Sequence, residues 1–272
     1  MRRTGTWLCL VVMLAVGAVF ASTASASEYE LQGIPEFGHC IPAKTPHTGE
    51  YTGKKCLALA GGKGNWDWEP GPEGPKKNFE GQLSLFKLET VGKKFEVQCA
   101  FGVAKGEYKS GKTLSVTFEL IGCLRQETHQ KCQLTPLKEG EMELQFEGEL
   151  GFIKGGEQPK VGLELKPTST LSFNCGIPPE VVTPVTVEGA AIGAIKPVNS
   201  MREVLKLSYL APGGKQNPEA FEGGEKATLT QNWVTFPEAP MSEQVGLTII
   251  GVEEKPKPLI IENEEPIEIK AK

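Results

Sequence analysis

The chain has 272 residues, of which 39% are hydrophobic and 23% charged, so it can bury a substantial core as one large or two small domains. Its 32 glycines and 20 prolines favour a loop-rich globular protein and fall short of the content typical of disorder. The 34 acidic residues outnumber the 29 lysines and arginines, which argues against nucleic-acid binding and predicts repulsion from anionic lipid surfaces.

The first 26 residues have the pattern of a secretory signal peptide. Two arginines near the start precede a charge-free apolar run over residues 8–20, and small residues at 24–26 form a cleavage motif. The run is too short to cross a bilayer as a helix, so a membrane anchor is the weaker alternative. We predict that the mature protein begins at Ser27, is secreted or held at the cell envelope, and contains no membrane span.

Cleavage would leave six cysteines, an even number that predicts three disulfides in an exported chain. They are Cys40, Cys56, Cys99, Cys123, Cys132 and Cys175. Although any pairing is formally possible, the preferred one joins sequence neighbours, Cys40–Cys56 and Cys123–Cys132. The pair Cys99–Cys175 then follows by elimination, and it joins two cysteines that both end strand-like runs.

A zinc site is the alternative for the first of these pairs, because His39 and His47 lie near Cys40 and Cys56. The paired cysteine knuckles that usually bind zinc are absent, and an oxidising compartment favours the disulfide. We therefore predict no metal and no cofactor, and we expect the histidines to be surface or loop residues.

Alternation of apolar and polar residues recurs throughout the chain after residue 78. In residues 141–150 one face is apolar and the other carries glutamates, which is typical of a strand with one wet face. Strands are predicted at residues 81–89, 95–101, 114–120, 141–150, 161–166, 170–175, 181–188, 205–209, 227–236, 245–252 and 266–270. This pattern predicts an all-β protein, an antiparallel sandwich or barrel of about ten to twelve short strands.

The chain divides into two regions of different texture. Residues 27–78 are rich in Gly, Pro and Lys and show little alternation, which predicts a loop-rich N-terminal region pinned by a disulfide. Residues 79–272 form the predicted β-domain. Within it a strand ending in Cys is twice followed by a V-T-[FV]-E segment, which allows two related β-units at about 79–160 and 161–272.

Several short motifs resemble those of a known group of proteins. They are F-G-x-C at 37–40, G-C at 122–123, G-E-L-G-F-I at 148–153 and V-G-L-x-L at 161–165. With them the mature chain resembles exported, disulfide-containing, β-rich proteins of unknown function from soil actinobacteria. The resemblance implies a bacterial exported protein and carries no activity with it.

Sequence motifs of the common enzyme classes are absent. There is no G-x-S-x-G, H-E-x-x-H, Walker or calcium-loop pattern, and Asp67 is the only aspartate available to a Ser-His-Asp triad. Six pairable cysteines leave no free thiolate for nucleophilic catalysis. The glutamates are numerous, and a pair of them in a cleft defines the alternative function, an extracellular glycan hydrolase. The ladder of Glu141, Glu143, Glu147 and Glu149 is one such candidate, although its alternation predicts a solvated strand face.

Two segments are candidates for recognition. Trp66, Asp67 and Trp68 lie in a Gly/Pro-rich segment predicted to be a loop, where exposed rings and a carboxylate suit a glycan or a peptide. The alternative is that one Trp packs against the β-domain and anchors the loop. The second segment, enclosed by Cys123 and Cys132, carries Arg125, Glu127 and His129, either as a recognition loop or as a solvated hairpin tip.

These observations favour an exported, monomeric, disulfide-stabilised β-protein. We predict a non-catalytic binding protein or a structural element of the envelope, whose partner is a glycan or protein of the cell envelope or its surroundings.

Overall fold

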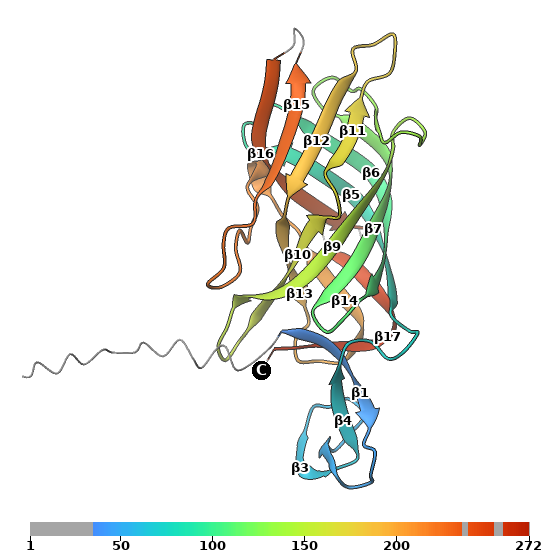
Figure 1. The fold of residues 1–272 in the computed structure, drawn as a ribbon, viewed down its shortest axis with the longest axis vertical. Coiled ribbons are helices and arrows are strands. Elements are labelled where there is room, and N and C mark those ends of the chain that lie inside the picture. Colours follow the sequence, from blue (N-terminus) through green and yellow to red (C-terminus); the bar gives the residue numbers. More distant parts are fainter. Residues whose placement is uncertain (1–34, 236–238, 253–257, 272) are drawn as a thin grey trace, which may run out of the picture. The chain divides into compact units, whose positions relative to one another are not determined.

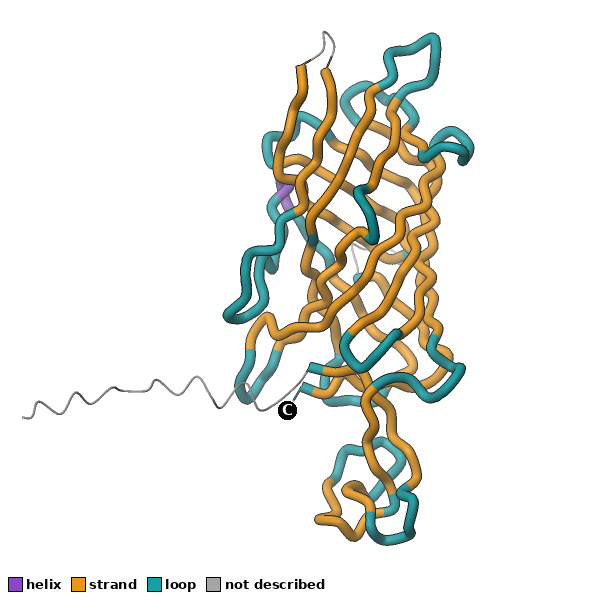
Figure 2. The backbone as a smooth tube through the Cα atoms, viewed as in Figure 1, coloured by secondary structure: helices purple, strands orange, loops and turns teal. Residues whose placement is uncertain are grey.

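The structure is a computed structural model that describes residues 35–235, 239–252 and 258–271. The predicted signal peptide and residues 27–34 lie outside these ranges. Within them the regular structure consists of β-strands and one 3-10 turn, η1 (Pro212–Gly214), which confirms the predicted all-β class. Figure 2 shows the strands and the loops that connect them.

The described residues form seventeen strands, more than the ten to twelve predicted. They are β1 (Glu36–Pro42), β2 (Gly49–Tyr51), β3 (Leu59–Gly64), β4 (Trp66–Pro70), β5 (Asn78–Thr90), β6 (Glu96–Tyr108), β7 (Thr113–Arg125), β8 (Cys132–Gln133), β9 (Glu141–Lys154), β10 (Lys160–Pro167), β11 (Leu171–Cys175), β12 (Thr183–Gly189), β13 (Ala191–Lys196), β14 (Arg202–Ser208), β15 (Leu229–Thr235), β16 (Ala239–Gly251) and β17 (Leu259–Lys270). Each segment predicted from alternation overlaps one of these strands.

Strand β13 was missed because its sequence does not alternate. Ile192 is fully buried although it points away from the barrel interior, since a loop covers that face. A methyl group placed on Gly162 of the neighbouring strand would lie 2.9 Å from the Ile192 side chain and 3.0 Å from the Phe221 ring of that loop. A strand covered on both faces reads as a continuous apolar run, so its period of two disappears.

Eight antiparallel strands close into a barrel. Pairing runs in the order β5, β6, β7, β9, β10, β13, β14 and β17, and β17 returns to β5 through Glu262 opposite Glu80. The remaining strands of this sheet continue from the other part of β5, in the order β16, β15, β12, β11 and β8. A bridge between Leu124 and Lys131 then brings the chain beside β8 back to the end of β7. Figure 1 shows the long strands β5, β6 and β7 side by side.

The inward-facing residues of the three long strands change parity at the same level along the sheet. Leu83, Gly102 and Leu120 pair in register, and so do Phe86, Cys99 and Cys123. All six are buried, yet in each strand the two members are three positions apart. An even spacing would be needed for simple alternation, so each strand is bulged here, and the β5–β16 register also shifts at this level.

The barrel interior is filled by side chains. The interior cavity among Phe79, Phe118, Leu163 and Tyr209 has a volume of about 10 Å³, enough for at most one water molecule. Tyr209 is buried, and its hydroxyl donates to the Leu163 carbonyl at 2.7 Å. The interior therefore holds no ligand-sized space between these residues, unlike barrels that enclose a ligand.

All six cysteines of the described residues form disulfides, and this indicates an oxidising, extracytoplasmic compartment. Cys40–Cys56 is paired as predicted. The other two predicted pairs are wrong, because the bonds are Cys99–Cys123 and Cys132–Cys175. Each of these joins residues directly opposite on neighbouring strands, β6 with β7 and β8 with β11. Strand register, not closeness in sequence, selects the partner.

The N-terminal region is more ordered than predicted. Residues 35–77, the N-terminal module, contain β1 to β4 instead of loops alone. Strand β1 pairs with β4 over five residues and with β17 over Glu36–Gly38. His39 of β1 is 7% exposed and its Nδ1 donates to the Gly71 carbonyl at 2.7 Å, so the expectation that every histidine is a surface or loop residue is wrong.

Candidate functional site

The Trp66–Asp67–Trp68 segment forms strand β4, not the predicted loop. Each of the three side chains is half-buried. Asp67 accepts a hydrogen bond from the Glu50 backbone N–H at 3.0 Å, and so it orders the neighbouring strand β2. This carboxylate already has an internal partner, which lowers its value as a ligand for sugar hydroxyls.

Trp68 anchors the N-terminal module. A methyl group on Gly38 would lie 2.2 Å from the Trp68 ring, so the indole packs against backbone that only glycine leaves open. On β17, the Lys270 ammonium lies 4.5 Å from the Trp68 ring centre and 4.5 Å from that of Tyr51, and it donates to the Tyr51 hydroxyl. These contacts fit the anchoring alternative better than a free aromatic platform.

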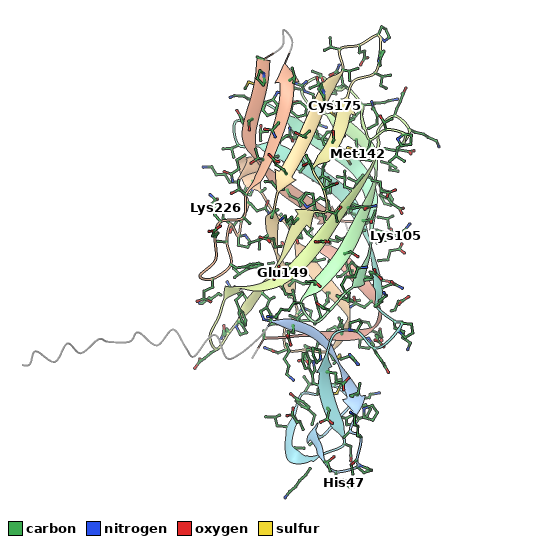
Figure 3. The ribbon with its side chains drawn as sticks, viewed as in Figure 1. His47, Lys105, Met142, Glu149, Cys175 and Lys226 are labelled. Carbon is green, nitrogen blue, oxygen red and sulfur yellow. A yellow bond between two sulfur atoms is a disulfide. The ribbon has the colours of Figure 1, made fainter. Side chains whose placement is uncertain are left out.

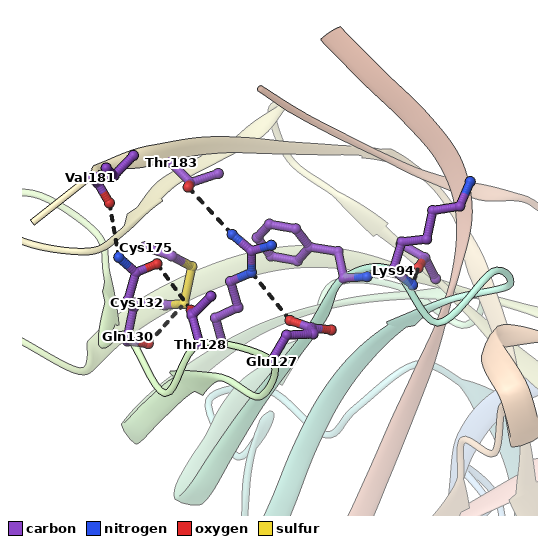
Figure 4. Close-up of polar contacts among 11 residues, drawn as sticks. Lys94, Glu127, Thr128, Gln130, Cys132, Cys175, Val181 and Thr183 are labelled. Carbon is purple, nitrogen blue, oxygen red and sulfur yellow. Dashed lines mark hydrogen bonds and ion pairs between the residues drawn. A yellow bond between two sulfur atoms is a disulfide. The ribbon is translucent and has the colours of Figure 1, made fainter. Parts of the chain in front are cut away.

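Arg125 of the second candidate segment is largely buried, and Figure 4 labels two residues near it, Glu127 and Thr183. Its side chain is 16% exposed, and its guanidinium carbon lies 4.3 Å from the centre of the buried Phe95 ring. It donates to the Glu127 carboxylate at 3.2 Å and to the Thr183 hydroxyl at 3.5 Å. His129 is exposed at the turn. Arg125 therefore packs on the buried Phe95 ring, and of the three candidate residues only Glu127 and His129 remain at the surface.

The glutamate ladder of β9 borders a shallow groove on the outer face of the barrel. The groove has a volume of about 410 Å³ and lies over Gly148, with Glu147, Glu149 and Glu164 among its lining residues. Glu149 and Glu164 are directly opposite on β9 and β10, a position that typically places Cβ atoms about 4.5–5.5 Å apart. Burial raises the pKa of Glu164 above its ordinary value, and the Glu149 charge raises it further. None of the residues lining the groove is aromatic.

A second groove, of about 830 Å³, lies where β16 and β17 separate along β5. Two of its polar lining residues, Glu264 and Asn263, accept hydrogen bonds from neighbouring side chains. The Glu264 carboxylate accepts from both the backbone and the side-chain N–H groups of Asn78 at 3.1 Å, and Tyr108 donates to Asn263 at 2.7 Å. Hydrogen bonding to Asn78 lowers the pKa of Glu264.

The segment that connects β1 to β4 was not recognised as a site from the sequence. We call residues 43–64 the tip; Figure 3 labels His47 within it. Leu59 is 75% exposed and Leu57 is 62% exposed, the two highest values among the exposed large hydrophobic side chains of the described residues. The sequence shows that Leu57 and Leu59 are two positions apart. No feature of the neighbouring sequence distinguishes an exposed pair of apolar residues from a buried one.

Backbone and covalent contacts define the tip. Cys56 lies within the tip and is bonded to Cys40. Asn65, the residue after the tip, donates its backbone N–H to the Tyr51 carbonyl at 3.1 Å. Thr52 donates its backbone N–H to the Ala58 carbonyl at 3.0 Å, which closes the turn before Leu59. The exposed leucines are thus held on a cross-linked turn.

No group of three or more His, Cys, Asp or Glu side chains in the described ranges is arranged to hold a metal ion. The same residues include no helix long and apolar enough to cross a membrane.

The fold and its surfaces define a class, a disulfide-bonded all-β barrel protein with an N-terminal β-module. Comparisons with protein-family models, curated proteins and solved structures found no match.

Proposed function

We propose that this chain is an exported, non-catalytic binding protein of the cell envelope, and that the tip is its contact surface. The observation that carries the proposal is the exposure of Leu57 and Leu59, at 62% and 75%, on a cross-linked turn. Leaving two neighbouring leucines in water forgoes roughly 1.5–3 kcal/mol for each, which binding to a partner would recover.

The remainder of the structure supports a role at the surface. The interior cavity among Phe79, Phe118, Leu163 and Tyr209 has a volume of only about 10 Å³, which favours recognition at the exterior. The disulfide and the pairing of β1 with β4 hold the tip before a partner arrives, which reduces the entropy lost on binding. A predicted signal peptide and three disulfides fit a chain that acts outside the cytoplasm.

The test is retention on isolated bacterial cell envelopes. The purified mature protein, residues 27–272, should co-sediment with envelopes, and Leu57→Ser/Leu59→Ser should lose at least about tenfold in affinity. Val181→Ser/Val182→Ser removes two exposed valines (53% and 38%) from another loop and should bind like the unsubstituted protein. Equal retention of all three proteins would contradict the assignment of the tip.

A glycan hydrolase is the second candidate, favoured by the raised pKa of Glu164 opposite Glu149. Glycoside hydrolysis uses two facing carboxyl groups, one of which has a raised pKa. If this candidate is right, the mature protein should release reducing sugar from cell-wall or plant polysaccharides, and Glu164→Gln should abolish that activity. Glu143→Gln, on the same strand as Glu149 but outside the groove, is the matched control. No release by the unsubstituted protein would remove this candidate.

A further inference from the structure

The charges of the tip are opposite to those of the chain as a whole. Residues 43–64 contain four lysines and one glutamate, a net charge of +3. The predicted mature chain has 27 lysines and arginines against 34 acidic residues, a net charge of −7. The tip is therefore a basic segment on an acidic protein, which the overall balance conceals.

The four lysines are available to a partner. Lys44, Lys54, Lys55 and Lys63 are all exposed. The ion pairs of the described residues all lie outside the tip. Elsewhere lysines are paired with glutamates, for example Lys105 with Glu119 at 2.8 Å and Lys94 with Glu243.

The leucines and the lysines occupy one short stretch of chain. Lys54 and Lys55 precede Leu57, and Lys63 follows Leu59. A soluble polyanion would use the lysines alone and leave the leucines in water. An anionic bilayer uses both, because its headgroups attract the ammonium groups and its acyl region accepts the apolar side chains.

We propose that the tip docks on an anionic lipid bilayer, with Leu57 and Leu59 inserted between the headgroups and the four lysines against lipid phosphates. This inference rests on the proposed function, which makes the tip the contact surface, and it names the partner. The acidic remainder of the chain would be repelled by the same surface, so the tip is the part that approaches it.

The experiment measures co-sedimentation of the mature protein, residues 27–272, with phosphatidylglycerol/phosphatidylcholine (1:1) vesicles and with phosphatidylcholine vesicles at low ionic strength. Binding is expected to the anionic vesicles only and should weaken as salt is added. Lys54→Glu/Lys55→Glu should lower the partition coefficient by about 30-fold or more, from about 1 kcal/mol for each lysine. Leu57→Ser/Leu59→Ser should lower it by about tenfold or more.

The matched control is Lys138→Glu/Lys160→Glu, which changes the net charge equally at two exposed lysines outside the tip. It should bind nearly like the unsubstituted protein. Thermal melting of every variant shows whether the fold is intact. A control variant that loses as much binding as Lys54→Glu/Lys55→Glu would overturn the assignment of the site.

Two further outcomes separate this inference from the proposed function. Retention on cell envelopes without binding to anionic vesicles would overturn the lipid partner and leave the tip as a contact surface for something else. Binding to neither would overturn both. Unchanged vesicle binding by Leu57→Ser/Leu59→Ser, with equally tight binding to soluble polyphosphate, would identify the ligand as a polyanion and not a bilayer.

Discussion

The barrel and the N-terminal module are stabilised in different ways. In residues 35–77 the buried hydrophobic side chains are Phe37, Tyr51 and Cys56, and of these Phe37 belongs to the extended cluster of aliphatic and aromatic residues that the barrel strands bury. A segment this small cannot bury enough apolar surface to hold its own structure, and it contains the Cys40–Cys56 bond. We infer that the barrel depends on packing and the module on its cross-link. A substitution in one region should therefore unfold that region without unfolding the other.

The largest expected effect is on the barrel core. Phe118 is 1% exposed and lies 5.6 Å, between ring centres, from both Phe86 and Phe146. Phe118→Ala should lower the free energy of unfolding by about 3–5 kcal/mol, because it removes a buried ring and leaves a cavity. Urea denaturation followed by circular dichroism measures this loss, with Thr117→Ala on the same strand as control. A loss below about 1.5 kcal/mol would contradict the packing argument.

Removal of the module's cross-link should act locally. Cys40→Ser/Cys56→Ser opens a loop of 16 residues and should cost the module about 3 kcal/mol. Tryptic cleavage after Lys54 and Lys55 should then accelerate by about 100-fold, while the barrel's unfolding midpoint stays unchanged. Cys99→Ser/Cys123→Ser is the contrasting variant, and it should lower the midpoint instead. If the first variant lowered the midpoint as much as the second, the two regions would form one cooperative unit.

A buried amide offers a stabilising substitution within the barrel sheet. Gln231 of β15 is 0% exposed, and neither amide atom has a hydrogen-bond partner in the structure. Gln231→Leu should raise the free energy of unfolding by about 1–3 kcal/mol, since it removes an unpaired buried polar group.

The matched control for that substitution is Gln216→Leu. Gln216 is also buried, but it donates to the Ile192 carbonyl at 3.2 Å and accepts from the Leu247 N–H at 2.9 Å. This variant should therefore be destabilised in the same denaturation experiment. Destabilisation by Gln231→Leu as well would show that the Gln231 amide has a partner in solution.

The smallest effect concerns the outer groove. The pKa of Glu164 is raised by burial, so the folded state holds its proton to higher pH than the unfolded state. Ionisation of Glu164 therefore lowers the free energy of unfolding as the pH rises above 4.5, the ordinary pKa of a glutamate. Below that pH the group is protonated in both states and contributes nothing to the pH dependence of stability. Because the group is partly exposed, Glu164→Gln should stabilise the barrel by only a few tenths of a kcal/mol at pH 7.

The stabilisation by Glu164→Gln should disappear by about pH 4, which urea denaturation across this pH range measures. Glu143→Gln, on an exposed position of β9, controls for the loss of one negative charge. Stabilisation that persisted unchanged at pH 4 would show that Glu164 acts through something other than its ionisation.

Much of the fold was predictable because alternation is a local property. Residues 141–150 identified β9 from their own pattern, and every other predicted segment likewise overlaps a strand. Prediction failed where the local sequence pattern does not reflect the environment of the residues in the folded protein. β13 lost its alternation because Phe221 and the chain around it cover its outer face. In β4, glycines and prolines around Trp66 and Trp68 indicated a loop, but pairing with β1 holds the segment extended.

The candidate site was less predictable than the fold. Arg125 was expected in a recognition loop or a solvated hairpin tip, but its guanidinium stacks on Phe95, a residue thirty positions earlier in the chain. The net negative charge of the chain predicted repulsion from anionic surfaces, yet the lysines of residues 43–64 are exposed together with Leu57 and Leu59. Composition averages charge over the chain, whereas recognition depends on which charges share one surface.

By itself, then, the sequence determined the all-β class and the positions of most barrel strands, because side-chain alternation is encoded within a few residues. Tertiary structure alone decided which strands pair, and with them the bonds Cys99–Cys123 and Cys132–Cys175. It also decided that Trp68 packs on Gly38 while Leu57 and Leu59 remain in solvent. Such choices depend on register between segments far apart in the chain, and no local pattern contains that information.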